Sequence, residues 1–247
     1  MKRLIKTSLL LLSCSVVYVN AADLRIAVDG SYAPFAQVNA EGKLYGFDID
    51  IAYALCHAME RTCTIVPQTW DGMIPGLQAG KFDAVISSMS VTKERSRVID
   101  FSDHYYSNSL ALIGPKSNHT KIDEKTLSGL TIGAYRSTVS SQYLEDNLAD
   151  KVKTKLYDTQ ELAYLDLSSG RIDLLLSDKL PAYAWLREPA GKTFEFKGKD
   201  IDINDKVAVA LRKGSPLRTQ FNQAIKTIVE NGTYQTINQN YFPFSIY

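Results

Sequence analysis

The chain has 247 residues, of which 45% are hydrophobic and 22% are charged, and its formal net charge is +1. This balance excludes a disordered chain and a coiled coil, and the scattered lysines and arginines give no reason to expect a nucleic-acid partner. The length suits one large domain or two small ones.

The first 21 residues have the organisation of a secretory signal peptide. A basic segment at residues 2–6 precedes an apolar stretch from Leu9 to Val19, and residues 19–21 resemble a signal-peptidase site. The apolar stretch is too short to span a membrane. We therefore expect cleavage after Ala21 and a mature protein in the periplasm.

A second way to process this N-terminus stays open. Leu11-Leu12-Ser13-Cys14 resembles a lipoprotein box, in which the cysteine is lipidated and becomes the first residue. The apolar run ahead of it is shorter than the usual ~7–15 residues. Cleavage after Ala21 would remove Cys14 and leave Cys56 and Cys63, an even number in an oxidising compartment, which predicts a disulfide. The three histidines are scattered, so we expect no metal site.

Short β-type runs alternate with helical patterns along the rest of the chain, which predicts parallel sheets of βα units. The first series is predicted at Leu24–Val28, Gly46–Met59, Cys63–Val66, Met73–Ala79 and Asp83–Ile86. In its first helix, Phe47 is expected in the core and Asp48 at the favourable N-terminus. The second series is predicted at Ser109–Gly114, Thr131–Ala134, Val139–Leu148, Lys153–Tyr157, Gln160–Ser168, Leu174–Leu176 and Ala182–Leu186. A strand at Val207–Leu211 and an amphipathic helix at Pro216–Asn231 return to complete the first series.

Two such series, connected by two crossings of the chain, predict an α/β protein with two lobes. We expect the first lobe to comprise residues 22–106 and 206–247, and the second lobe residues 107–205. Ligands of open α/β sheets bind beyond the carboxyl ends of the strands. A cleft between the lobes should therefore be lined by the loops Asp29–Tyr32, Thr69–Gly72, Ser87–Arg95, Tyr135–Ser140 and Ser177–Lys179.

The turn at Ser87–Arg95 carries the clearest chemistry. Three serines fall between a predicted strand and Thr92, which is a helix-start signal. A helix N-terminus offers unpaired N–H groups and a partial positive charge, and the guanidinium of Arg95 can grip both oxygens of a carboxylate. The turn therefore suits a small carboxylate. The simpler alternative is a capped helix whose Arg95 pairs with Glu94 or Asp100.

Several short motifs are spread over the chain after the signal peptide. They are Asp29-Gly-Ser-Tyr32-Ala-Pro34-Phe35, Gly46-Phe47-Asp48-Ile49-Asp50, Trp70-Asp71-Gly-Met-Ile-Pro75, Ile86-Ser87-Ser88-Met89-Ser90, Arg95, Phe101-Ser102-Asp103, Gly170-Arg171-Ile-Asp173, Asp178 and Asn231-Gly232-Thr233-Tyr234. Together they resemble the periplasmic amino-acid-binding proteins of ABC importers, in the group that includes lysine/arginine/ornithine-binding and histidine-binding proteins.

This resemblance implies the type II periplasmic-binding fold, in which each lobe is a mostly parallel sheet flanked by helices and two hinge crossings join the lobes. It also implies a free L-amino acid as ligand, a membrane permease as partner, a monomer, and neither a cofactor nor a catalytic residue.

The resemblance further assigns roles to residues of both lobes. Arg95, with the Ser88 turn, would bind the ligand α-carboxylate, and Asp178, with Ser88 and Ser90, would receive the α-ammonium group. Because Arg95 and Asp178 come from opposite lobes, a bound amino acid would bridge them and favour closure.

The ligand side chain would be recognised by Asp29, Tyr32, Trp70 and Ser87. An acid beside aromatic rings favours a cation, and a cation–π contact in a desolvated pocket adds roughly 1–2 kcal/mol. We therefore expect arginine first, then lysine, ornithine and histidine. The alternatives are that Asp29 is a turn residue ahead of Gly30 and that Trp70 belongs to the core of the lobe.

The loop Tyr135–Ser140 departs from the family pattern. Ser137 stands where relatives usually have a glycine. Thr138 and the amide of Val139 would lie nearest the ligand, although Val139 supplies no hydroxyl. Tyr135 is expected to alter the shape of the pocket.

Two other functional classes stay open. The same fold occurs in secreted cyclohexadienyl dehydratases, so an enzyme acting on arogenate or prephenate is the main alternative. Its substrate would need a second cation in the pocket, for which Arg136 is available, but Asp29 would repel a carboxylate at the distal end. A ligand-sensing domain of a receptor, or a surface adhesin, is the third class.

Overall fold

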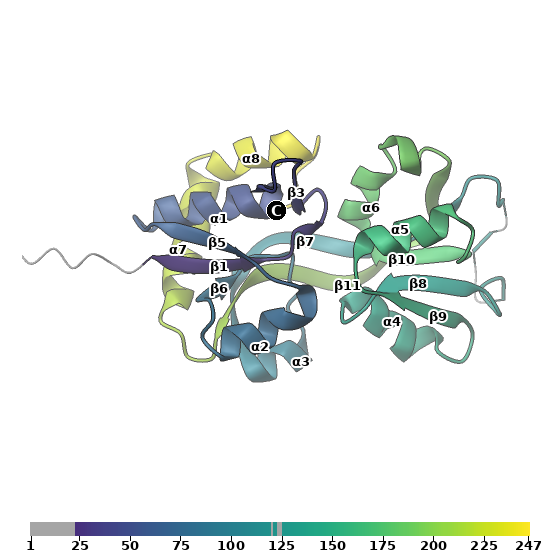
Figure 1. Ribbon diagram of the computed structural model, residues 1–247, viewed down its shortest axis with the longest axis horizontal. Coiled ribbons are helices and arrows are strands. Elements are labelled where there is room, and N and C mark those ends of the chain that lie inside the picture. Colours follow the sequence, from purple (N-terminus) through teal and green to yellow (C-terminus); the bar gives the residue numbers. More distant parts are fainter. Residues whose placement is uncertain (1–22, 120, 123–124) are drawn as a thin grey trace, which may run out of the picture.

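The computed structural model describes residues 23–119, 121–122 and 125–247, so the hypotheses on the signal peptide and on Cys14 concern residues outside the described part. Two α/β bodies lie side by side and are joined by two long strands, β7 (Ile99–Pro115) and β11 (Phe194–Arg212) (Figure 1). We call the body that contains β1 the first lobe and the body that contains β8 the second lobe. This is the predicted two-lobe α/β architecture.

The strands form a sheet that continues through both lobes in the order β5-β1-β6-β11-β7-β10-β8-β9. In the first lobe, β1 (Leu24–Val28) pairs in parallel with β5 (Cys63–Pro67) and β6 (Ala84–Val85). In the second lobe, β8 (Thr131–Tyr135) pairs in parallel with β9 (Lys153–Tyr157) and β10 (Leu174–Asp178). The connecting strands β7 and β11 are antiparallel to their neighbours. Each lobe therefore has a parallel sheet that ends on the strands shared by both lobes.

Helices flank the sheet in both lobes. The first lobe carries α1 (Phe47–Ala58), α2 (Met73–Gln78), α3 (Lys93–Val98), α7 (Leu217–Glu230), α8 (Thr233–Tyr241) and a 3₁₀ turn at Trp70–Gly72. The second lobe carries α4 (Val139–Leu148), α5 (Gln160–Ser168), α6 (Lys179–Trp185) and a 3₁₀ turn at Pro189–Gly191. Among the described residues, no helix combines the length and the apolar character that a membrane crossing needs.

Both faces of the sheet are buried, which explains the continuous apolar runs of its strands. In β1, Ile26 and Val28 pack in the cluster beneath α1 and α7, whereas Ala27 packs in the cluster of α2 on the other face. In β10, Leu175 and its neighbour Leu174 likewise belong to two different clusters. This alternation follows from the two-residue period of a strand.

The two connecting strands are longer than the sequence predicted. Only Ser109–Gly114 and Val207–Leu211 were expected to be extended, but β7 and β11 run alongside each other from one lobe to the other. Their pairing register shifts between Ile201 and Asp205 and again around Val207, where polar residues interrupt the apolar alternation. The proposed lobe boundaries at 106/107 and 205/206 fall inside these strands.

A small antiparallel sheet, which the sequence did not predict, follows β1. It consists of β2 (Ser31–Tyr32), β3 (Ala36–Val38) and β4 (Leu44–Tyr45). Its first strand carries Tyr32 from the end of β1 toward the second lobe. The expected loop at Asp29–Tyr32 is therefore held by strand pairing.

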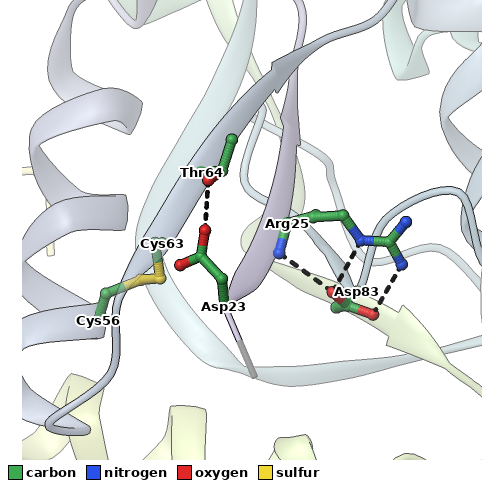
Figure 2. Close-up of a disulfide and its surroundings, with 6 residues drawn as sticks. All are labelled: Asp23, Arg25, Cys56, Cys63, Thr64 and Asp83. Atoms are coloured by element: carbon green, nitrogen blue, oxygen red, sulfur yellow. Dashed lines mark hydrogen bonds and ion pairs between the residues drawn. A yellow bond between two sulfur atoms is a disulfide. The ribbon is translucent and has the colours of Figure 1, made fainter. Parts of the chain in front are cut away.

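The predicted disulfide between Cys56 and Cys63 is present and ties the end of α1 to the start of β5 (Figure 2). Nearby, the guanidinium and the backbone N–H of Arg25 in β1 both donate to the Asp83 carboxylate, at 3.3 and 3.1 Å. Arg212 of β11 donates to the same carboxylate at 3.2 Å. These bonds fix the strands of the first lobe to one another.

Candidate functional site

A small cavity lies between the two lobes. All ten residues that the sequence predicted as ligand-binding line it, and Tyr135 lines it as well. The lining residues are Asp29, Tyr32, Trp70, Ser87, Ser88, Ser90, Arg95, Tyr135, Thr138, Val139 and Asp178. The structure therefore brings the predicted set together, while the role of each member in ligand binding stays a proposal.

Arg95 is placed by the cap of α3. The Thr92 hydroxyl accepts the Arg95 backbone N–H at 3.1 Å, which confirms the predicted helix start. The guanidinium donates to the carbonyl of Ser90 at 2.9 Å and, across the cavity, to the carbonyl of Ser137 at 3.0 Å. It also lies 5.2 Å from the centre of the Trp70 ring. Burial lowers the pKa of Arg95, although an arginine remains charged at neutral pH.

The alternative in which Arg95 pairs with Asp100 is wrong. Asp100 forms an ion pair with Lys213 at 2.7 Å and accepts the Gly214 backbone N–H at 2.8 Å. The guanidinium of Arg95 points instead toward backbone carbonyls at the cavity wall.

The serines of the turn have different tasks. Ser88 adopts a left-handed backbone with φ 52°, and its hydroxyl donates to the Asp48 carboxylate at 2.9 Å. The Ser87 hydroxyl accepts the Asp29 backbone N–H at 2.9 Å. The Ser88 hydroxyl therefore holds the turn against α1. Its oxygen keeps lone pairs that can still accept a hydrogen bond, so the contact between Ser88 and the ligand stays a prediction.

Asp48 does more than stabilise the N-terminus of its helix. It is buried and accepts hydrogen bonds from the hydroxyls of Ser88 and Tyr105, the latter at 2.8 Å. Burial raises the pKa of Asp48 to about 7, although both hydrogen bonds favour the charged form. Asp48 thus anchors the ligand-facing turn, a role that its position in the sequence did not reveal.

Asp178 stands at the carboxyl end of β10 and is 6% exposed. Its Oδ2 accepts the hydroxyl of Tyr32 from the first lobe at 2.5 Å. Its Oδ1 is buried and makes no hydrogen bond of ordinary geometry with the described residues, although the Asn108 amide lies close enough to lower the pKa of Asp178. Burial, followed by repulsion from Asp205, raises the pKa of Asp178 to about 7. A buried acceptor without a partner is costly, so this oxygen is suited to receive a donor from a ligand.

Two residues behind Asp178 were missed by the sequence analysis. Asp205 of β11 is buried, and Asn108 of β7 donates to its carboxylate at 3.5 Å. Burial raises the pKa of Asp205 as well. Both residues lie in the connecting strands, where the sequence offered no motif.

Asp29, from the first lobe, also lines the cavity. Its Oδ1 accepts the backbone N–H of Ser31 at 3.1 Å and the hydroxyl of Ser31 at 2.6 Å, so the turn alternative is correct for this oxygen. Its Oδ2 accepts the hydroxyl of Tyr135 from the second lobe at 2.7 Å. The ring of Tyr135 lies 6.2 Å from that of Trp70 and 6.3 Å from that of Tyr32. The acid is thus surrounded by aromatic rings.

The loop that departs from the family pattern contributes its backbone. Ser137 has a left-handed φ of 57°, a conformation that glycine adopts without strain. Its carbonyl accepts the indole N–H of Trp70 at 3.0 Å as well as the guanidinium of Arg95. The Thr138 hydroxyl caps α4 by donating to the Tyr135 carbonyl and accepting the Ser141 N–H. This hydroxyl is therefore used by the cap.

The cavity thus presents one guanidinium and two buried carboxylates, one from each lobe. An α-amino acid carries a carboxylate and an ammonium at a fixed separation, and the charges of Arg95 and Asp178 are opposite to these two. Asp29 adds a second buried carboxylate to the cavity wall. Among the described residues, no cluster of histidine, cysteine and acidic side chains is arranged to hold a metal ion.

Comparison with known proteins agrees with this geometry. The family model described as "Bacterial extracellular solute-binding proteins, family 3" matches residues 24–244. The chain is 35% identical to the lysine/arginine/ornithine-binding periplasmic protein of Escherichia coli K12, over 98% of this chain and 99% of that protein. An ancestral arginine-binding protein bound to arginine superposes with a TM-score of 0.83 at 31% identity, over 89% of this chain and 98% of that one. An ancestral amino acid-binding protein described as a precursor of cyclohexadienyl dehydratase superposes with a TM-score of 0.81 at 32% identity, over 89% and 95% of the two chains.

Proposed function

The chain belongs to family 3 of the bacterial extracellular solute-binding proteins, and on that basis we propose that it captures a free basic L-amino acid and delivers it to the membrane permease of an ABC importer. Arginine is the preferred ligand in this proposal, ahead of lysine, ornithine and histidine. The observation that carries the proposal is the charge pattern of the cavity, which is lined by Arg95 and by the two buried acids Asp29 and Asp178.

Each charge of the ligand has a designated partner. The unpartnered Oδ1 of Asp178 would accept the α-ammonium group. Arg95 would exchange its bond to the Ser137 carbonyl for two parallel bonds to the α-carboxylate, which are stronger because the acceptor is charged. Asp29 would accept the distal cation, whose apolar stem or plane would lie against Trp70.

Closure follows from the distribution of these partners between the lobes. Arg95 and Asp29 belong to the first lobe and Asp178 to the second, so a bound amino acid stabilises the arrangement in which the lobes meet. The proposed lobes comprise residues 22–106 with 206–247, and residues 107–205. The connecting strands β7 and β11 would carry the hinge near residues 105–109 and 205–207.

The Escherichia coli relative is a periplasmic protein, which supports export of this chain across the membrane. We propose that residues 1–21 are a signal peptide cleaved after Ala21. Lipidation at Cys14 is the competing outcome, and mass spectrometry of the mature N-terminus distinguishes the two.

The dehydratase alternative has weaker support. The structural neighbour related to that enzyme is itself described as an amino acid-binding protein. Asp29 at the distal end would repel the second carboxylate of prephenate. Arg136, the candidate second cation, pairs with Asp158 at 2.9 Å and does not line the cavity.

Thermal unfolding against a panel of amino acids tests the proposal. Ligand at ~1,000-fold over Kd adds about 4 kcal/mol to the free energy of unfolding, which for a chain of this size raises Tm by roughly 8–16 °C. We expect this rise with arginine, a smaller rise with lysine, ornithine and histidine, and its loss in Asp29→Asn. Asp150→Asn, which removes an exposed carboxylate, is the control. A rise only with acidic or neutral amino acids would contradict the assignment of Asp29, and turnover of prephenate would favour the enzyme.

A further inference from the structure

We propose that Tyr135 and Ser31 leave Asp29 only one free acceptor position, so that the site contacts the distal cation of its ligand through a single hydrogen bond. Such a site should bind a guanidinium and an ammonium with similar dissociation constants. The inference rests on the proposed function and deepens it, because it names the residues that set selectivity among basic amino acids.

The Asp29 carboxylate has few acceptor positions left for a ligand. A carboxylate offers about four lone-pair positions, two on each oxygen. Both positions of Asp29 Oδ1 are taken by Ser31, whose backbone N–H and hydroxyl donate at 3.1 and 2.6 Å. One position of Oδ2 is taken by the Tyr135 hydroxyl at 2.7 Å. One position on Oδ2 remains for a ligand.

The groups that donate to Asp29 are held in place. Tyr135 is 4% exposed and its ring packs beside Trp70 and Tyr32. Asp29 is 6% exposed, and its backbone N–H is bound to the Ser87 hydroxyl. Burial, followed by the charge of Asp29, raises the pKa of Tyr135, so the phenol remains a donor throughout the neutral range. A fixed donor next to a fixed carboxylate cannot give up its position without cost.

The guanidinium of arginine and the ammonium of lysine differ in shape. A guanidinium gains most from a carboxylate when two parallel N–H groups reach it at once. An ammonium is a compact point charge whose N–H groups diverge, so one close contact already gives most of its attraction. At a site with one free position, arginine cannot form the second hydrogen bond that would make it bind more tightly than lysine.

The test is the ratio of the dissociation constants for lysine and arginine, measured by isothermal titration calorimetry on the full chain. In the wild type we expect a ratio below about tenfold. Tyr135→Phe frees a second position on Oδ2, and Ser31→Ala frees one on Oδ1, so both variants should bind arginine more tightly. Each should raise the ratio by roughly 10- to 100-fold, the change that corresponds to one added hydrogen bond to a charged group.

Tyr157→Phe is the matched control. The Tyr157 hydroxyl also donates to an aspartate, Asp166, at 2.9 Å, but it lies in the second lobe and does not line the cavity. This control should leave the ratio unchanged. The inference is overturned if Tyr135→Phe and Ser31→Ala leave the ratio at its wild-type value, or if both weaken all basic ligands equally, since the hydroxyls would then only position Asp29. If the wild type binds neither arginine nor lysine, the proposed function fails together with the inference.

Discussion

Asp178→Asn is the most informative single substitution, because it should weaken ligand binding and at the same time stabilise the ligand-free protein. The variant keeps the shape of the side chain and removes the charge that would pair with the α-ammonium group. Loss of one partner of a buried charge pair costs about 2–5 kcal/mol, which corresponds to roughly 30- to 4,000-fold in Kd. Under the proposed assignment, the Oδ1 that would accept the ammonium makes no hydrogen bond of ordinary geometry with the described residues, so we expect a value in the upper half of that range.

The same substitution should stabilise the protein without ligand at alkaline pH. The pKa of Asp178 rises from its ordinary value of 3.8 to about 7 in the folded state. Between these two values the native state binds more protons than the unfolded state, so the free energy of unfolding falls as pH rises. This loss of stability, which is the cost of ionising the buried Asp178, is absent below about pH 3.8 and complete above about pH 7. Because asparagine does not ionise, Asp178→Asn removes the penalty and should raise Tm at pH 8 but not at pH 4.

Two assays on one preparation measure both effects. Isothermal titration calorimetry with arginine at pH 8 gives the loss of affinity, and scanning calorimetry without ligand at pH 4 and pH 8 gives the change in Tm. Asp150→Asn is the control, since it removes an exposed carboxylate of the second lobe and should change neither. An unchanged arginine affinity would refute the assignment of the ammonium site. A Tm at pH 8 lower than that of the wild type would refute the argument that the ionised Asp178 carboxylate destabilises the folded state.

Three further predictions follow from the same contacts. Asp48→Asn should flatten the fall of Tm between pH 4 and pH 8, because burial raises the pKa of Asp48 to about 7; a fall as steep as in the wild type would contradict this. Arg95→Lys should keep the wild-type circular dichroism spectrum but weaken arginine binding by roughly 30- to 100-fold, because an ammonium cannot make the two parallel hydrogen bonds that a guanidinium makes to the α-carboxylate. Unchanged binding would mean that the α-carboxylate does not bind at Arg95. Reduction of the disulfide between Cys56 and Cys63 should lower the free energy of unfolding by about 2–3 kcal/mol, which is the chain-entropy value for so short a loop. Denaturant titrations with and without reductant measure this loss. The variant with both cysteines replaced by alanine is the control, because reductant should not change its stability.

Helices and strands with a regular apolar period and a cap were predictable from the sequence. The bounds Val139–Leu148 and Gln160–Ser168 agree with the structure, since Thr138 and Thr159 cap these helices. The connecting strands were predicted only in part, because polar residues such as Asn108 and Asp205 interrupt their apolar alternation. Helix α8 was not predicted, since most of its residues are polar and few of them are buried.

The membership of the cavity was predictable, whereas its hydrogen bonds were not. Residues at the carboxyl ends of parallel strands meet at one edge, which is why ten residues from five loops gather there. The bond from Tyr135 to Asp29 joins positions 106 residues apart, and the bond from Ser88 to Asp48 joins positions 40 residues apart. Such pairs depend on how the lobes and helices pack, and no local pattern encodes them.

Binding of L-arginine to the purified mature protein, unfolded and refolded to remove any ligand carried through purification, tests the central claim most directly. We expect isothermal titration calorimetry to show one arginine per chain, with lysine, ornithine and histidine competing for the same site and glutamate not competing. Absence of binding by all four basic amino acids, together with saturable binding of an acidic or neutral amino acid, would contradict the account.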